Sequence, residues 1–348
     1  MAADLLLTYS MNNSGFFGTF LALCAAVLLA SCTAGSSHSS PAAEQPKQAS
    51  ASGVQGTGET ETHVEMRNVN IHLDPELILR VHDLSGKFLP TKKGSPPAFD
   101  DNLSYLVAID SAEVSVSTAS MSHALNTYAF NERDSPLKNV KLEIQGNQIK
   151  QTGTLNKGPG IPFEMLATMS PTPEGKIRIR PSKLKAAHLP VKGLMKLLGV
   201  DMAKLINTRS TKGISVDGDD IIMDPAQILP PPKMRGRITA VRLQGDEIVQ
   251  TFGTEKRPST GKSSGGNYMA YRGGVLRFGK LTMNDTDMRL IDADPRDPFD
   301  FFPDHYKDQL VAGYSKTTAT GGLLVYMPDY NKLSKSASPS GAVSRHTD

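Results

Sequence analysis

The two cysteines of the chain carry its most reactive side chains, and both lie near the N-terminus. Cys24 is inside an apolar run that extends from Phe16 to Ala30, and Cys32 follows soon after that run. A thiol can form a disulfide, bind a soft metal or act as a nucleophile. If the chain is cut before Cys32, a single thiol remains, which excludes an internal disulfide and a cysteine-based metal site.

The apolar run before Cys32 is typical of a signal peptide rather than of a membrane span. It is shorter than the roughly 20 residues that cross a bilayer as a helix, and it gives way abruptly to Thr, Gly and Ser. The sequence Leu-Ala-Ser-Cys at Leu29–Cys32 resembles the bacterial lipobox. The resemblance implies that the Cys32 thiol receives a diacylglyceryl group, that residues 1–31 are removed and that the new amine is acylated. Thr33 after the cysteine implies an outer-membrane lipoprotein that faces the periplasm.

The segment before the apolar run departs from a typical signal peptide in one respect. It contains Asp4 and no Lys or Arg, whereas such segments normally carry positive charge. Initiation at Met11 instead of Met1 would remove Asp4 and leave the amine as the only cation. The alternative interpretation is a buried N-terminal helix that carries both cysteines.

Acidic side chains gather in residues 290–306, LIDADPRDPFDFFPDHY. Asp292, Asp294 and Asp297 could supply oxygen ligands to a hard divalent cation. Their order does not match an EF-hand loop, which also needs a central Gly and a terminal Glu, and prolines interrupt the stretch. Asp beside Pro is typical of turns and helix caps, which is the favoured interpretation; a metal site or catalytic carboxylates are the alternatives. The aromatic residues of the stretch are expected to anchor it in a core: Phe299, Phe301, Phe302 and Tyr306.

No other motif assembles an enzyme. Gly261-Lys262-Ser263 has the form of the end of a phosphate-binding loop, but Lys256 occupies the place of its first Gly. Ser259 and Lys262 have the spacing of an acylating Ser-Lys pair without its partner motifs. The eight histidines show neither H-x-x-x-H nor H-E-x-x-H spacing, and no Ser lies in G-x-S-x-G. We therefore expect a non-catalytic protein that has no cofactor.

The charge balance argues against nucleic-acid binding. The formal net charge is only +3, and 39% of the residues are hydrophobic, which is enough to bury a core. The expected partners are the membrane, through the N-terminal lipid, and a phospholipid ligand.

The sequence pattern predicts that most elements of the chain are β-strands, and any site must be positioned by them. VNIHL at 69–73 and VKLEI at 140–144 alternate apolar and polar residues, as strands with one wet face do. Three segments predict hairpins with a Gly followed by Asn or Asp, at Gly146, Gly218 and Gly245. The first and third hairpins share the pattern Q-G-x-x-I-x-Q-T.

One segment, residues 189–207, breaks the strand pattern and predicts an amphipathic helix of about four turns. The favoured interpretation is a helix packed on a sheet, and the alternative is a helix that lines a lipid groove or touches a membrane surface. The two are compatible. The candidate groove residues on its apolar face are Val191, Leu194, Met195, Leu198, Met202 and Leu205.

Composition divides the chain into parts, because residues 33–62 hold too few apolar side chains to fold. The expected parts are a signal peptide (1–31), a flexible tether after the lipidated cysteine (32–62), a β-rich body (63–253), a linker (254–267), a smaller C-terminal β and loop part (268–333) and a disordered tail (334–348). Pro230-Pro231-Pro232 is interpreted as a rigid connector at a sheet edge or crossover, and otherwise as a ligand for an aromatic groove.

The segments HLPVKGLMKLLG and LPPPKMRGRITAVRLQGDEIVQTFG resemble a group of uncharacterised bacterial envelope proteins. The order of amphipathic strands, a G-x-x-I-x-x-T-G pattern and one apolar helix is more distantly similar to secreted proteins of the tubular lipid-binding type. We expect an α+β chain, mostly β, in which a curved antiparallel sheet of amphipathic hairpins carries one long amphipathic helix. The distant resemblance implies a lipid-binding function.

Three functions remain open at this point. The first is a tethered protein that holds a lipid or another apolar ligand in a groove between sheet and helix. The second is a non-catalytic envelope protein that binds another protein or the cell wall, which an exposed aromatic patch would favour. The third is a hydrolase or metal-dependent enzyme, which would require Asp and His side chains from 292–305 to converge in a cleft.

Overall fold

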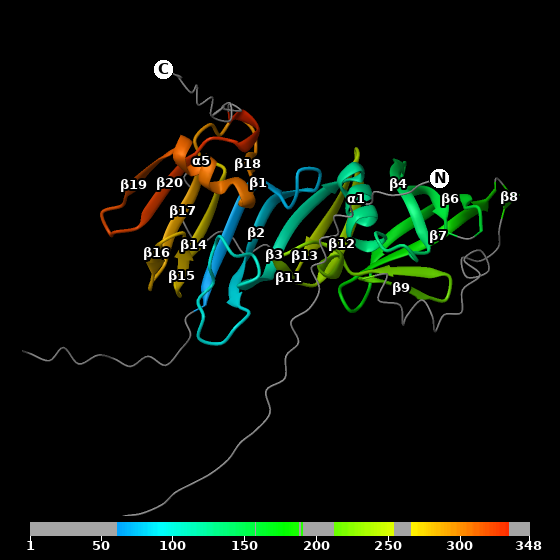
Figure 1. Cartoon of the computed structure of the whole chain (residues 1–348), viewed down its shortest axis with the longest axis horizontal. Helices are drawn as coiled ribbons and strands as arrows, with labels where there is room; N and C mark the ends of the chain where they lie inside the picture. The colour runs from blue at the N-terminus through cyan, green and yellow to red at the C-terminus, as the bar shows by residue number, and fades with distance from the viewer. Residues whose placement is uncertain (1–60, 157, 188, 191–211, 254–265, 334–348) are drawn as a thin grey trace, which may run out of the picture. The chain divides into compact units, whose positions relative to one another are not determined.

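The computed structural model describes residues 61–156, 158–187, 189–190, 212–253 and 266–333 (Figure 1). Within these ranges the chain is mostly β with few helices, which confirms the expected class. Two large sheets and one small ribbon contain the described strands. The ribbon pairs β15 (Leu276–Phe278) with β16 (Leu281–Met283).

The larger sheet has eleven strands among the described residues, and its main path runs β12-β13-β3-β2-β1-β14-β17-β20-β19. Its strands are β1 (Thr62–His72), β2 (Ile78–Pro90), β3 (Tyr105–Ser117), β12 (Ile238–Gln244), β13 (Glu247–Phe252), β14 (Tyr268–Arg272), β17 (Asp287–Asp292), β19 (Tyr314–Thr317) and β20 (Leu323–Met327). Two short strands join it from the side: β11 (Lys233–Arg235) pairs with β3, and β18 (Phe299–Phe301) pairs with β1. Both of these pairs are parallel, and so is the pair of β17 with β20. The sheet is therefore mixed, whereas the sequence predicted an antiparallel sheet.

The smaller sheet has seven strands among the described residues, in the order β4-β5-β6-β7-β10-β9 with β8 beside β7. They are β4 (Leu137–Gln145), β5 (Gln148–Leu155), β6 (Ile161–Pro171), β7 (Ile177–Ala186), β8 (Leu189–Pro190), β9 (Ile214–Asp217) and β10 (Asp220–Met223). The three predicted hairpins are confirmed as β4–β5, β9–β10 and β12–β13. Each turns at a Gly with positive φ, a conformation that glycine adopts without steric cost.

Helices are short throughout the described part. They are α1 (Thr118–Ala124) with η1 (Leu125–Ala129), α4 (Pro225–Ile228), η2 (Pro303–His305), α5 (Tyr306–Ala312) and η3 (Tyr330–Lys332). The Ser117 hydroxyl caps α1, and the helix is tied to β4 because the Leu142 amide donates to the Ser122 hydroxyl at 2.9 Å.

The long amphipathic helix expected at 189–207 is not shown by the structure. Residues 191–211 lie outside the described residues, and the two residues that precede them, Leu189 and Pro190, form strand β8 against β7.

The C-terminal residues complete the larger sheet. Strand β14 pairs along β1, with Val64 opposite Tyr271, and β17, β20 and β19 follow it outward (Figure 1). The strands of 268–333 therefore belong to the same sheet as β1, β2 and β3.

One segment carries the chain from the smaller sheet to the larger one. After β10, residues 224–237 form α4, the proline run and β11 before entering β12 at Ile238. The interpretation of Pro230–Pro232 as a crossover is confirmed by this connection. The Ile238 amide donates to the Gly175 carbonyl in the turn between β6 and β7 at 3.1 Å, which ties the end of the crossover to the smaller sheet. We call residues 224–237 the crossover segment.

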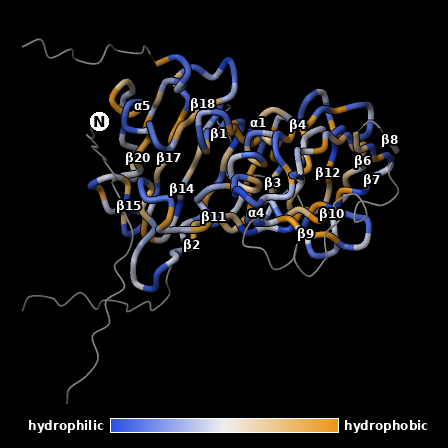
Figure 2. The backbone as a smooth tube through the Cα atoms, turned by 45° about the vertical axis from the view of Figure 1, so that its right-hand side comes forward, coloured by the Kyte–Doolittle hydropathy of each residue, from blue (hydrophilic) through white to orange (hydrophobic). Residues whose placement is uncertain are grey.

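Buried apolar side chains from both sheets form one continuous cluster. Figure 2 shows apolar and polar positions mixed along the strands, in keeping with the alternation that the sequence predicts for sheets with one buried face. The buried faces of both sheets therefore contribute to one core, and the two cavities described next lie within it.

Candidate apolar ligand site

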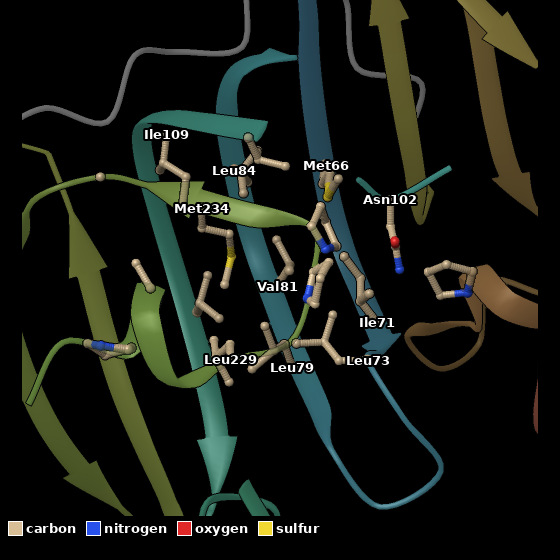
Figure 3. A pocket seen from close by; sticks show the side chains of 18 of the residues that line it. Met66, Ile71, Leu73, Leu79, Val81, Leu84, Asn102, Ile109, Leu229 and Met234 are labelled. Atoms are coloured by element: carbon tan, nitrogen blue, oxygen red, sulfur yellow. The ribbon is translucent and has the colours of Figure 1, made fainter. Parts of the chain in front are cut away.

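A cavity of about 120 Å³, which we call cavity 1, lies between the strands β1–β3 and the crossover segment (Figure 3). The strands contribute an apolar floor whose side chains include Met66, Ile71, Leu79, Val81, Leu84 and Ile109. The crossover segment contributes Leu229, Pro231, Pro232 and Met234 as its cover. Leu229 and Met234 are half-buried, so the cover is one residue layer thick at these positions.

The cover is held close to the sheet by local sequence. Strand β11 pairs in parallel with β3, which sets Met234 opposite Val107. Gly236 follows, and a Cβ there would lie 2.9 Å from the Phe252 ring and 3.0 Å from the Ile109 Cβ. Prolines supply no backbone N–H that the apolar cavity would leave unsatisfied. At its prolines the crossover segment can therefore lie on an apolar surface without burying an unpaired backbone N–H.

Aromatic rings close one part of cavity 1. The Phe88 and Tyr105 rings stack with centroids 4.3 Å apart, and Tyr271 meets Phe88 edge to face at 5.3 Å. Tyr105 and Tyr271 are 6% and 1% exposed. Burial raises the pKa of both phenols, and nearby Asp101 adds to the effect at Tyr105. Both phenols therefore stay neutral and keep this wall uncharged at physiological pH.

Five polar or acidic side chains interrupt the apolar wall among the described residues: His72, Asn102, Asp224, Gln250 and Asp304. The His72 ring lies 2.8 Å through Nε2 from Oδ1 of Asp300 and stacks on Phe302 at 5.3 Å. Its Nδ1 atom is buried and has no hydrogen-bond partner in the described part of the chain. An apolar wall with a few placed polar groups is typical of small-molecule sites.

A second cavity of about 80 Å³, cavity 2, lies between the smaller sheet and the helices α1 and η1. Its wall is apolar on both sides: Met121, Leu125 and Phe130 come from the helical side, and Ile149, Phe163 and Met165 come from the strands. Its polar lining residues among the described ones are Gln151 and Ser215, so no charged side chain lines it there.

Strand β13 contributes to the walls of both cavities. Ile248 lines cavity 2 and Gln250 lines cavity 1. Residues two apart on a strand share a face and lie about 7 Å apart, so the two cavities approach each other at this strand.

The acidic stretch does not form a metal site in the structure. Among the described residues, no group of three or more His, Cys, Asp or Glu side chains could hold a metal ion. Asp294 is paired with Arg296 through two contacts of 2.6 Å, and Asp297 lies 2.8 Å from the Lys332 ammonium. Hydrogen bonds from Arg296 hold the pKa of Asp294 well below its usual range. Cations of the chain itself thus occupy the positions that a metal would take.

Asp292 has a structural role in the same stretch. Its carboxylate accepts hydrogen bonds from Asn267 Nδ2 and from the Asp294 amide, both at 2.8 Å, and it is 4% exposed. Burial raises its pKa. The turn-and-cap interpretation is supported, and the aromatic residues Phe299, Phe301 and Tyr306 are buried as expected.

The remaining candidates separate into two groups. Cys32 and the six groove candidates on 191–205 lie outside the described residues. The histidines His72 and His82 bind different partners, Asp300 and the Ser115 hydroxyl, and do not converge. What sequence reasoning missed is the covering role of the crossover segment, although its proline run and apolar Leu229 and Met234 were visible signals.

No helix in the described ranges is long and apolar enough to span a membrane. No protein-family model, curated protein or solved structure matches this chain.

Proposed function

We propose that this chain is a lipid-anchored, exported envelope protein that binds an apolar ligand carrying an acyl chain, and that it is not an enzyme. The observation that carries the proposal is cavity 1, which the crossover segment covers with Leu229, Met234 and prolines. Cavity 2 provides a second apolar space beside the same strand β13. The lipobox-like Leu29–Cys32 supports the anchor and the outer-membrane location facing the periplasm.

The sizes of the cavities favour a slender ligand. An engineered apolar cavity of about 150 Å³ admits benzene, so cavities of about 120 and 80 Å³ suit segments of one hydrocarbon chain. Each CH₂ group moved out of water contributes ~0.8 kcal/mol, and ten of them contribute about 8 kcal/mol before the cost of association. A single acyl chain of a lipid is thus the favoured occupant.

The amphipathic helix predicted around Leu194 and Leu198 belongs to the same proposal. We propose that it packs on the smaller sheet and adds apolar surface there. Two observations support this: its spacing of apolar residues, and the position of Ile214, which follows the segment and lines cavity 2.

The experiment uses the full chain with Cys32→Ser, so that the anchor contributes no lipid of its own. The protein is purified from a membrane-containing host and studied by native mass spectrometry and organic extraction. We expect acyl lipid at near-stoichiometric amounts. Leu229→Lys places a charge in the cover of cavity 1 and should release the lipid, whereas Val311→Lys, at a position that is 86% exposed, should retain it. A mass without ligand, and no uptake from phosphatidylcholine vesicles, would reject the proposal.

A second candidate function, a non-catalytic protein-binding module, is favoured by one surface. At the end of the larger sheet, Val311 and Tyr314 are 86% and 52% exposed. Tyr314 stacks on Tyr326 at 4.7 Å on the edge strand β19, whose four residues are all exposed. Tyr326 is half-buried, and an exposed aromatic ring such as Tyr314 on a sheet edge is typical of a docking surface. Two results together would support this function instead. The Cys32→Ser protein would carry no lipid, and it would bind a component of an envelope extract that the same protein with Tyr314→Ala does not bind.

A further inference from the structure

Two glutamines occupy equivalent positions in the repeated pattern Q-G-x-x-I-x-Q-T. The pattern covers Gln145–Thr152 and Gln244–Thr251, and its second Gln is Gln151 in one copy and Gln250 in the other. Both copies form hairpins, so Gln151 lies on β5 and Gln250 lies on β13. The repeat therefore places the same side chain at the same position of two different sheets.

Each of these glutamines lies in the wall of a different apolar cavity. Gln250 lines cavity 1 and is 5% exposed, and Gln151 lines cavity 2 and is 6% exposed. No hydrogen bond joins either side chain to another described residue, and neither amide is among the fully buried polar atoms without a partner, so each amide retains some contact with open space. An amide has two N–H donors and an oxygen acceptor, and buried polar groups of folded proteins almost always have partners.

Gln309 shows what a structural buried glutamine looks like in the same protein. It is 0% exposed, and its oxygen accepts from the Phe302 amide at 3.1 Å. Its nitrogen donates to the carbonyls of Asp300 and Pro328, each at 2.9 Å. Gln151 and Gln250 are nearly buried as whole residues but make no such contacts with described residues, so hydrogen bonding within the described part of the protein does not explain why an amide occupies these positions.

We propose that Gln151 and Gln250 are ligand anchors that hydrogen-bond a neutral ester or amide carbonyl set within a hydrocarbon chain. This inference rests on the proposed function, because it assumes that the cavities take an acyl ligand. A neutral group is expected at Gln151 because no charged side chain among the described residues lines cavity 2, and an anionic group is disfavoured at Gln250 because Asp224 and Asp304 line cavity 1. A carbonyl oxygen accepts an amide N–H, and each amide would gain in the complex a partner that it lacks in the unliganded protein.

The test compares two probes of similar length, undecane and methyl octanoate, which differ in the ester. The full chain with Cys32→Ser is titrated with each probe in competition with diphenylhexatriene, a fluorescent hydrocarbon. The variants are Gln250→Met, Gln151→Met and their combination, because Met is unbranched and of similar length. Gln244→Met and Gln145→Met are matched controls, since they make the same change at the exposed first Gln of each repeat.

We expect the buried variants to weaken methyl octanoate binding by about three- to tenfold and to change undecane binding by less than twofold. The controls should leave both affinities unchanged. The melting temperature of the unliganded buried variants should not fall, because the change removes no hydrogen bond to a described residue. If one variant does not fold, the variant at the other cavity decides the test.

Two outcomes overturn the inference and distinguish it from the proposed function. If both probes bind but the buried variants bind methyl octanoate as tightly as the parent protein does, the amides hold only water, and the ligand-anchor role is wrong while the cavities still bind acyl chains. If the parent protein binds neither probe, the proposed function fails together with the inference.

Discussion

Nε2 of His72 lies 2.8 Å from Oδ1 of Asp300, in a buried contact that joins the end of β1 to β18. The same aspartate is held on every side: its amide donates to Asp329 Oδ1 at 2.8 Å, and its second carboxylate oxygen accepts from the Asn331 amide at 3.1 Å. Its carbonyl accepts from Gln309. Asp300 therefore joins β18 to three other segments, which are β1, α5 and the stretch 329–331.

This connection predicts a large stability cost for Asp300→Ala. The change leaves a buried imidazole and a backbone amide without their acceptor, which typically costs about 3–5 kcal/mol. Urea unfolding followed by circular dichroism measures it. The exposed pair His305–Asp308, with Nδ1 and Oδ2 3.2 Å apart, provides the control, and Asp308→Ala should cost less than about 1 kcal/mol. Equal costs for the two variants would contradict the role given to Asp300.

A second prediction concerns acid stability and Asp220. Its carboxylate lies 2.8 Å from Nη2 of Arg180 and 3.1 Å from Nη1 of Arg178, and hydrogen bonds from Arg180 hold its pKa below the usual range. A lowered pKa in the folded state stabilises the fold fully above the unfolded-state value near 3.9, and the contribution is lost as the pH falls through the folded-state pKa.

We therefore expect Asp220→Asn to lower the free energy of unfolding at pH 7 by about 1–2 kcal/mol and to flatten its decline below pH 4. Urea unfolding at pH 7, 4 and 3 measures both effects. Asp219→Asn, at the exposed neighbouring position, serves as the control and should follow the parent protein at every pH. If the free energy of unfolding fell equally steeply with pH in Asp220→Asn and in the parent protein, groups other than Asp220 would determine the acid sensitivity.

The proposed lipid anchor predicts a difference between the two cysteines. Cys32→Ser should abolish incorporation of radiolabelled palmitate and retain the uncleaved precursor, because the serine hydroxyl does not replace the thiolate as nucleophile. Cys24→Ser changes the same atom inside the apolar run and should leave labelling and membrane association unchanged. Labelling that persists in Cys32→Ser and disappears in Cys24→Ser would place the anchor elsewhere.

Two glycines with positive φ predict costs of different size. Gly146 has φ +62°, and an added Cβ would meet nothing within 4 Å, so Gly146→Ala should cost about 1 kcal/mol from backbone strain alone. Gly253 has φ +73°, and its Cβ would lie 2.1 Å from the Asp110 carbonyl oxygen. Gly253→Ala should cost at least twice as much. Thermal unfolding measures both costs. Similar melting temperatures for Gly146→Ala and Gly253→Ala would show that the backbone at Asp110 moves to make room for the added Cβ.

Local sequence predicts the hairpins well because their turns need little else. A Gly at 146, 218 and 245 beside alternating residues defines both the turn and the register, and the structure confirms all three. Turn chemistry likewise explains the acidic stretch, since Asp292 and Asp294 satisfy nearby backbone and cationic groups.

Long-range pairing explains what the sequence does not predict. A parallel pair such as β3 with β11 depends on which strand the chain meets after a crossover. The alternation of apolar and polar residues along the chain does not specify that strand. The cover of cavity 1 was missed for this reason: half-buried Leu229 and Met234 form a wall only after Pro230–Pro232 has carried the chain onto β3. Similarly, Gln151 and Gln250 look like ordinary polar strand residues until their burial is known.

The position of β1 has a consequence for how the protein is made. This first strand lies in the interior of the larger sheet, where Val64 faces Tyr271 of β14 and Val69 faces Phe299 of β18. Strand β2 pairs with β1 and follows it directly, but its other two partners, β14 and β18, are synthesised some 200 residues later, and contacts of such high sequence separation slow folding. In a chain that crosses a membrane N-terminus first, as proposed here, the pairing of β1 with β14 and β18 thus waits until most of the chain has emerged. Late completion of the larger sheet would suit the proposed export, because a translocation channel would then receive a chain in which that sheet has not yet closed around β1.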